Sequence, residues 1–164
     1  MTGWAVATPP VVATWDVRDA DALAGTRQQL ESTVRSRLPV LDRPQHQEML
    51  SHVVLVASEL VTNALRHTDG PARLDLMVAE GSLLVSVLDH RPDVPPVLSP
   101  DRDLGQGGFG LQLAMRVADD VGWFRTDGGK RVWARFAVPA VEVAPRPAPA
   151  RRGPRRRAST DGGR

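Results

Sequence analysis

Apolar residues between Leu50 and Asp69 recur at steps of three and four positions, and this spacing is the most regular pattern in the chain. Such spacing is typical of a helix that buries one face. Gly70 and Pro71 follow directly and predict where the helix ends. We therefore expect a half-buried helix at the centre of the fold, with its apolar face made of Leu50, Val53, Val54, Ala57, Leu60, Val61 and Ala64.

The residues before this helix predict one strand and another helix. Residues 9–17 begin with two prolines and are rich in β-branched side chains, as expected of a strand. Asp19 or Asp21 can then cap a helix that runs to about residue 38. The apolar seam of this helix consists of Leu23, Thr26, Leu30, Val34 and Leu38.

The residues after the central helix alternate in the manner of strands. Residues 72–89 turn at Glu80-Gly81 and residues 120–138 turn at Asp127-Gly128-Gly129, so each segment predicts a β-hairpin. Between the hairpins, a proline-rich loop at residues 91–104 precedes a short helix. This order of elements predicts an α+β two-layer sandwich, or α/β in coarser terms, with one mixed, mostly antiparallel sheet and helices on one face.

The composition indicates a folded domain in a reducing compartment. Of the 164 residues, 41% are hydrophobic, and the lack of cysteine excludes disulfides and thiolate metal sites. The first residues do not resemble a signal peptide, and no apolar run is long enough to cross a bilayer, so we expect a cytoplasmic protein that does not act at a membrane.

The basic character of the chain belongs to its last part. Residues 141–164 hold seven arginines against Glu142 and Asp161, so the net charge of +2 conceals an acidic body and a basic tail. We expect a flexible N-terminus at residues 1–8, one folded domain at residues 9–139 and a disordered Pro- and Arg-rich tail at residues 140–164. Because the tail has no aromatic residues among its arginines, we do not expect specific nucleic-acid recognition.

Polar side chains border the apolar face of the central helix. Glu59 and Asn63 are four residues apart, which places the carboxylate and the amide one turn from each other on the same side. Arg66 and His67 extend this strip by another turn. Either the strip is the solvated edge of a half-buried helix, or it gathers a base, a metal-binding amide and two cations at one site.

Two further features suit a ligand. Asp89 ends a predicted buried strand, where a carboxylate either caps a turn or accepts a hydrogen bond from a ligand. The short helix is preceded by glycines, which let backbone amides approach a polyphosphate, and the helix start adds partial positive charge. A proline-rich loop in place of a strand before these glycines disfavours a dinucleotide-binding motif, while a hinge without a ligand stays open. This segment reads Gly105, Gln106, Gly107, Gly108, Phe109, Gly110 and Leu111.

The string ELVTNALRH, from Glu59 to His67, resembles the N box of the GHKL ATPases, in particular the small anti-sigma-factor serine kinases of the RsbW and SpoIIAB type. Asp89 and the glycine segment match the adenine and lid boxes of that family. The chain departs from the family at residues 90–93, which replace glycines, and at the start of the last strand, where the family has Gly-Thr or Gly-Lys-Thr and this chain has Gly129-Lys130-Arg131 without a threonine. Lys130 in this stretch is interpreted as a turn lysine that faces water, with neutralisation of phosphate as the alternative.

The resemblance implies the GHKL, or Bergerat, ATP-binding fold, with ATP and Mg²⁺ as cofactors. It implies that Glu59 polarises the attacking nucleophile, that Asn63 reaches the magnesium, and that Asp89 accepts from the adenine amine, which a carboxylate suits because it only accepts. Further nucleotide contacts are expected from Arg66, His67, Gly105, Gly107, Gly108, Phe109, Gly110 and Leu111.

The resemblance also implies partners. Small members of this family phosphorylate a serine on an anti-anti-sigma protein with a STAS-like fold, alternately bind a sigma factor, and usually form homodimers. We therefore expect a serine/threonine-protein kinase that regulates transcription by partner switching. The alternative is an ATP-binding interaction module in which the nucleotide sets only the conformation and no phosphate is transferred.

Overall fold

The computed structural model describes residues 9–67, 70–79, 81–91 and 109–139. The predicted N-terminal segment and basic tail lie outside these ranges, so the proposed domain boundaries stay predictions. The α-helices and strands are β1 (Val11–Val17), α1 (Ala20–Arg37), α2 (Gln47–His67), β2 (Ala72–Ala79), β3 (Ser82–Asp89), α3 (Phe109–Val117), β4 (Asp120–Thr126) and β5 (Gly129–Ala137), with short 3₁₀ turns at Pro39–Asp42 and Pro44–His46.

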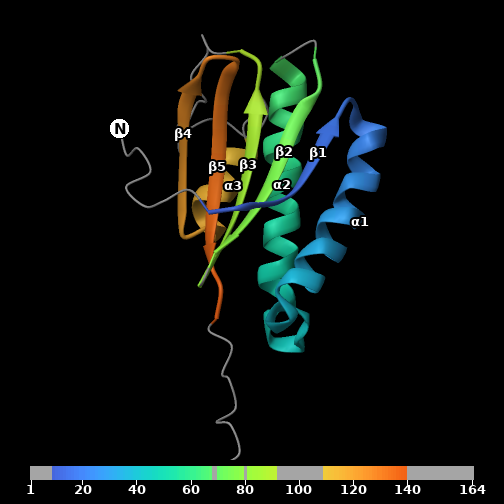
Figure 1. Ribbon diagram of the computed structural model, residues 1–164, viewed down its shortest axis with the longest axis vertical. Coiled ribbons are helices and arrows are strands. Elements are labelled where there is room, and N and C mark those ends of the chain that lie inside the picture. The colour runs from blue at the N-terminus through green and yellow to red at the C-terminus, as the bar shows by residue number, and fades with distance from the viewer. Residues whose placement is uncertain (1–8, 68–69, 80, 92–108, 140–164) are drawn as a thin grey trace, which may run out of the picture.

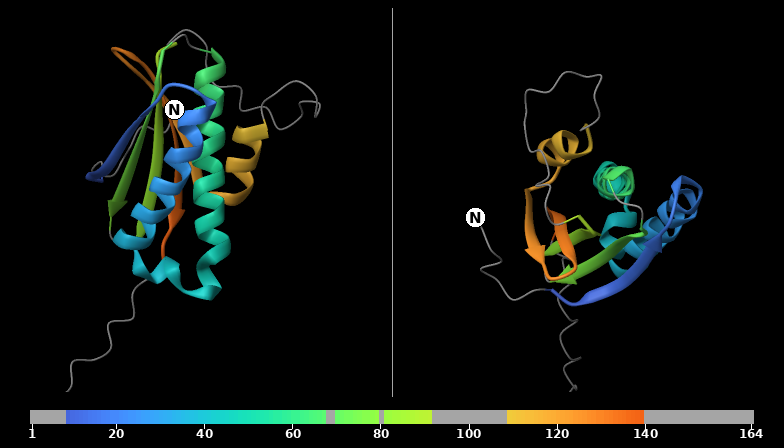
Figure 2. Two further views of the ribbon diagram at one scale, coloured as in Figure 1. Left: turned by 90° about the vertical axis from the view of Figure 1, so that its right-hand side faces the viewer. Right: turned by 90° about the horizontal axis from the view of Figure 1, so that it is seen from above.

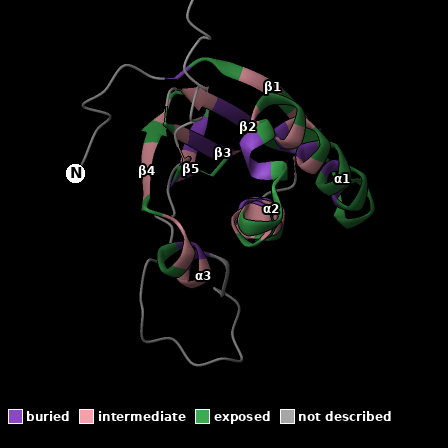
Figure 3. Cartoon of the chain, turned by 90° about the horizontal axis from the view of Figure 1, so that it is seen from below, coloured by how far each residue is buried: buried purple, intermediate pink, exposed green. Residues whose placement is uncertain are grey.

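The five described strands form one sheet in the order β1-β2-β3-β5-β4 (Figure 1). The helices lie on one face of this sheet (Figure 2). Seen along the strands, the sheet curves around α2, with α1 towards the β1 end and α3 towards the β4 end (Figure 3). The predicted two-layer α+β fold is confirmed, and every pair of neighbouring strands is antiparallel, so the sheet is not mixed in the part that the structure describes.

Helix α1 begins where the sequence predicts. The side chain of Asp19 accepts a hydrogen bond of 2.8 Å from the backbone N–H of Ala22, so Asp19 rather than Asp21 is the N-cap. The predicted seam faces the core, where Leu23, Thr26, Leu30 and Val34 are buried and Leu38 is partly buried.

Helix α2 buries the predicted stripe with one difference. Val54 is only partly buried, whereas Val56, which the predicted stripe omits, is completely buried. Helix α3 also packs against α2. The buried surface of α2 is therefore wider than the single stripe that faces the sheet.

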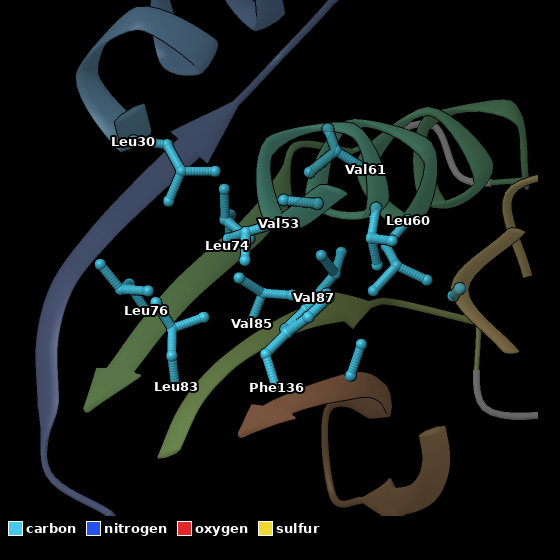
Figure 4. Packing of buried hydrophobic residues seen from close by; sticks show 14 of the residues in the cluster. Leu30, Val53, Leu60, Val61, Leu74, Leu76, Leu83, Val85, Val87 and Phe136 are labelled. Carbon is cyan, nitrogen blue, oxygen red and sulfur yellow. The ribbon is translucent and has the colours of Figure 1, made fainter. Parts of the chain in front are cut away.

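The main hydrophobic core lies between α2 and the sheet. Side chains of Leu74, Leu76, Val85 and Val87 point from the sheet towards the helix layer (Figure 4), and all are at most 1% exposed. Phe136 of β5 closes the same core. Burial of each such side chain stabilises the fold by about 1.5–3 kcal/mol.

The opposite face of the sheet is also partly buried. Met77, Leu84 and Trp133 form a second apolar cluster there. Beside it, the carboxylate of Asp75 is 3% exposed and forms an ion pair of 2.6 Å with Arg131. The strand alternation therefore separates two buried surfaces rather than a buried and a solvated one.

Candidate functional site

The end of α2, the end of β3 and the start of β5 meet at one end of the molecule (Figure 1). The loop after α2 reaches the residue that follows Asp89, because a Cβ atom added at Gly70 would lie 3.9 Å from Cδ2 of His90. Asp89 itself lies directly opposite Lys130 in the β3–β5 register. The fold therefore brings the end of the central helix and the carboxylate at the strand end to the same end of the molecule.

Glu59 and Asn63 lie on α2, and both are half-buried. Among the residues that the structure describes, neither side chain forms a hydrogen bond or an ion pair. Their four-residue separation places both on one side of the helix. A carboxylate and an amide are thus held on a rigid element with their oxygen atoms available.

Arg66 and His67 are placed differently. Arg66 is exposed and lines a hollow of about 410 Å³ between the start of α1 and the end of α2, together with Asp19 and Thr62. His67 is the last residue of α2, and its side chain lies outside the described residues. A contact of either residue with a nucleotide stays a prediction.

Asp89 is 3% exposed and is already paired. Its Oδ2 atom lies 2.9 Å from Nζ of Lys130, which is also 3% exposed. Its Oδ1 atom accepts a hydrogen bond of 2.9 Å from the backbone N–H of Arg91, and Nζ of Lys130 donates a second bond of 3.1 Å to the carbonyl of Arg91. The three residues form a closed polar cluster at the end of the strand.

Gly129 allows this close approach. Its φ angle is 153°, and a Cβ atom at this position would lie 2.1 Å from the carbonyl oxygen of Asp89. Any other residue would push the start of β5 away from Asp89. The glycine at the end of the predicted turn therefore sets the distance between Lys130 and its partner.

The structure corrects the interpretation of Lys130. The sequence predicts a turn lysine that faces water, but Lys130 is the second residue of β5 and its ammonium is buried against Asp89. The strand alternation indicates this burial, because alternate residues of a strand share a face and Lys130 therefore lies on the same face as Val132, Ala134 and Phe136. The side chains of these three residues face the helices. Burial of Lys130 was not predicted from the sequence, because lysine is almost never buried without a partner and the sequence alone does not show that Asp89 lies opposite it.

The glycine segment is described only in part. Gly105, Gly107 and Gly108 lie outside the described residues, and α3 begins with Phe109 and Gly110, where the side chain of Phe109 is not described. The side chain of Leu111 is 4% exposed and packs in the hydrophobic core. A contact between Leu111 and a phosphate would have to involve its backbone.

The oxygen atoms of Asp89 and Asn63 suit an adenine nucleotide with magnesium. Among the described residues, Oδ1 of Asp89 accepts one hydrogen bond and Oδ2 forms the ion pair with Lys130, so the carboxylate has acceptor capacity left for an exocyclic amine. Within the described ranges, no group of three or more His, Asp or Glu side chains is arranged to hold a metal ion. Asn63 is the residue that could hold magnesium, an ion that commonly takes only one or two protein ligands and completes its shell with phosphate oxygens and water.

Comparison with known proteins identifies the family of this chain. The sequence matches the family model of the histidine kinase-like ATPase domain over residues 18–136, which covers most of the chain and includes Glu59, Asn63, Asp89 and α3. No match was found among curated proteins. In the described part of the chain, no helix has both the length and the apolar character needed to cross a membrane. The chain belongs to the family of histidine kinase-like ATPase domains and is an ATP-binding protein of the GHKL type.

Proposed function

We propose that this protein is a partner-switching regulator of transcription that transfers the terminal phosphate of ATP to a serine of a STAS-like anti-anti-sigma protein. The observation that supports the proposal is the pair Glu59 and Asn63, half-buried one turn apart on α2 and without partners among the described side chains. A base beside a magnesium ligand is the minimum that phosphoryl transfer requires of the protein, because the reaction depends mainly on positioning and electrostatics.

Each residue then has a defined role. Asp89 accepts a hydrogen bond from the adenine amine, and the amide oxygen of Asn63 coordinates magnesium, which neutralises charge on the phosphates. Glu59 accepts the proton of the serine hydroxyl while the bond from the serine oxygen to phosphorus forms. The bond from that phosphorus to the bridging oxygen breaks, and ADP leaves.

Transfer of label tests the proposal. The full chain is incubated with γ-labelled ATP, magnesium and a candidate STAS partner. We expect phosphoserine on the partner, and at least a 100-fold slower transfer by Glu59→Gln with nucleotide binding retained. Glu48→Gln is the matched control, because Glu48 lies in the first turn of the same helix and is exposed. Undiminished transfer by Glu59→Gln would remove Glu59 from the role of base.

A second candidate function is an interaction module in which ATP sets only the conformation. Two departures from the family's pattern favour it: residues 90–93 replace the glycines expected after Asp89, and the stretch Gly129-Lys130-Arg131 lacks the expected threonine. In this case Mg-ATP binds and changes the affinity for the partner, but no label appears on the partner. A sigma factor as an alternate partner and a homodimeric state remain proposals that pull-down and light scattering can test separately.

A further inference from the structure

Lys130 lies beside Asp89, the residue to which the proposed function assigns the adenine amine. Its ammonium forms an ion pair of 2.9 Å with Oδ2 of Asp89 and donates a hydrogen bond of 3.1 Å to the carbonyl of Arg91, and it carries three donor hydrogens. Lys130 and Asp89 face each other directly across strands β5 and β3. A hydrogen-bond donor therefore lies beside the acceptor that the family uses to recognise adenine.

The position of the donor is fixed by the backbone. Gly129 brings the start of β5 against the carbonyl of Asp89, and both charged groups are 3% exposed. A long lysine side chain is normally mobile, but burial, the ion pair with Asp89 and the hydrogen bond to the carbonyl of Arg91 hold this ammonium in one place. The donor is therefore preorganised before any ligand arrives.

The chemistry of adenine matches this pair. Its Watson–Crick edge offers the N6 amine as a donor and the neighbouring N1 atom as an acceptor. Asp89 supplies only acceptors and Lys130 supplies only donors. The two side chains together are complementary to both atoms of that edge, whereas Asp89 alone reads only the amine.

We propose that Lys130 is a specificity-determining residue of the nucleotide site, in which its ammonium donates a hydrogen bond to N1 of the bound adenine while Asp89 accepts from N6. The inference rests on the binding of ATP within the proposed function. Lys130 is then the donor beside Asp89. If the ion pair were only structural, nucleotide affinity would not depend on the N1 atom of adenine.

Nucleotide analogues test this inference on the full wild-type chain. Dissociation constants are measured by calorimetry for the magnesium complexes of ATP, 1-deaza-ATP, which lacks the N1 acceptor, and 7-deaza-ATP, which keeps it. A charge-assisted hydrogen bond predicts that 1-deaza-ATP binds about tenfold or more weakly than ATP, while 7-deaza-ATP binds nearly as well as ATP. Equal binding of ATP and 1-deaza-ATP would overturn the inference.

Two variants separate recognition from stability. In Lys130→Met, the ratio of the affinities for ATP and 1-deaza-ATP should fall to nearly one. In Arg131→Met, which removes the neighbouring ion pair on the other face, the ratio should stay that of the wild type. If Lys130→Met weakens all three nucleotides equally, Lys130 is structural only and the inference is wrong.

The outcomes also distinguish this inference from the proposed function. If Lys130→Met does not fold, the analogue comparison on the wild-type chain still decides. If the wild-type chain binds ATP and 1-deaza-ATP equally, only the role of Lys130 fails. If it binds no ATP at all, the proposed function fails together with the inference.

Discussion

Two buried carboxylates lie on opposite faces of the same sheet, and each pairs with a cation from the start of β5. Asp89 faces the helix side and pairs with Lys130, whereas Asp75 faces away from the helices and pairs with the next residue, Arg131. Consecutive residues of one strand point to opposite faces, so the two pairs are neighbours in sequence but belong to different environments.

The two carboxylates differ in their further partners. Asp75 also accepts bonds from Oγ1 of Thr14 at 2.7 Å and from Nε of Arg73 at 3.4 Å, so its network joins side chains of three strands. Asp89 has only Lys130 and the backbone N–H of Arg91 among its described partners. We infer that Asp75 holds the sheet together, whereas Asp89 retains the capacity to accept a bond from a ligand.

The largest loss of stability is expected when the pair of Asp89 and Lys130 is broken. Lys130→Met leaves the Asp89 carboxylate buried with only a backbone donor, and loss of one partner of a buried ion pair typically lowers the free energy of unfolding by about 3–5 kcal/mol. Urea denaturation measures this loss. The control is the double variant Asp89→Leu with Lys130→Met, in which no charge is left unpaired and much of the stability should return. A loss below about 1 kcal/mol in Lys130→Met would show that Asp89 does not depend on its partner.

A smaller effect is expected on the other face. Arg131→Met removes a charge-assisted bond, but Asp75 keeps Thr14 and Arg73, so we expect a loss of about 3 kcal/mol at most. The same urea experiment compares the two variants directly. If Arg131→Met is the more damaging substitution, the interpretation of Asp75 as the better-connected carboxylate is wrong.

The elements of the fold were predictable because they follow from local patterns. The steps of three and four residues predict α2, Asp19 or Asp21 as a cap predicts the start of α1, and the alternation around Asp127-Gly128-Gly129 predicts the last hairpin. Burial of Val56 was not predictable from this repeat, because α2 also packs against α3, an element distant in sequence.

The candidate site was predictable in its parts but not in its connections. Family resemblance pointed to Glu59, Asn63 and Asp89, and the structure places the first two on one side of α2 and the third at the end of β3. The pairing of Asp89 with Lys130 depends on the register between two strands some 40 residues apart, which no local pattern specifies. The ion pair of Asp75 with Arg131 likewise connects β2 with β5, which are separated by β3 in the sheet.

We propose that Asp89, and not Asp75, holds the nucleotide. The most direct test compares the stability of the wild-type chain, Asp89→Asn and Asp75→Asn with and without Mg-ATP, at a concentration about 100 times the wild-type dissociation constant. We predict a gain of about 2.7 kcal/mol in the free energy of unfolding for the wild type and for Asp75→Asn, and almost none for Asp89→Asn. An equal gain in all three proteins, or no gain in the wild type, would contradict the claim.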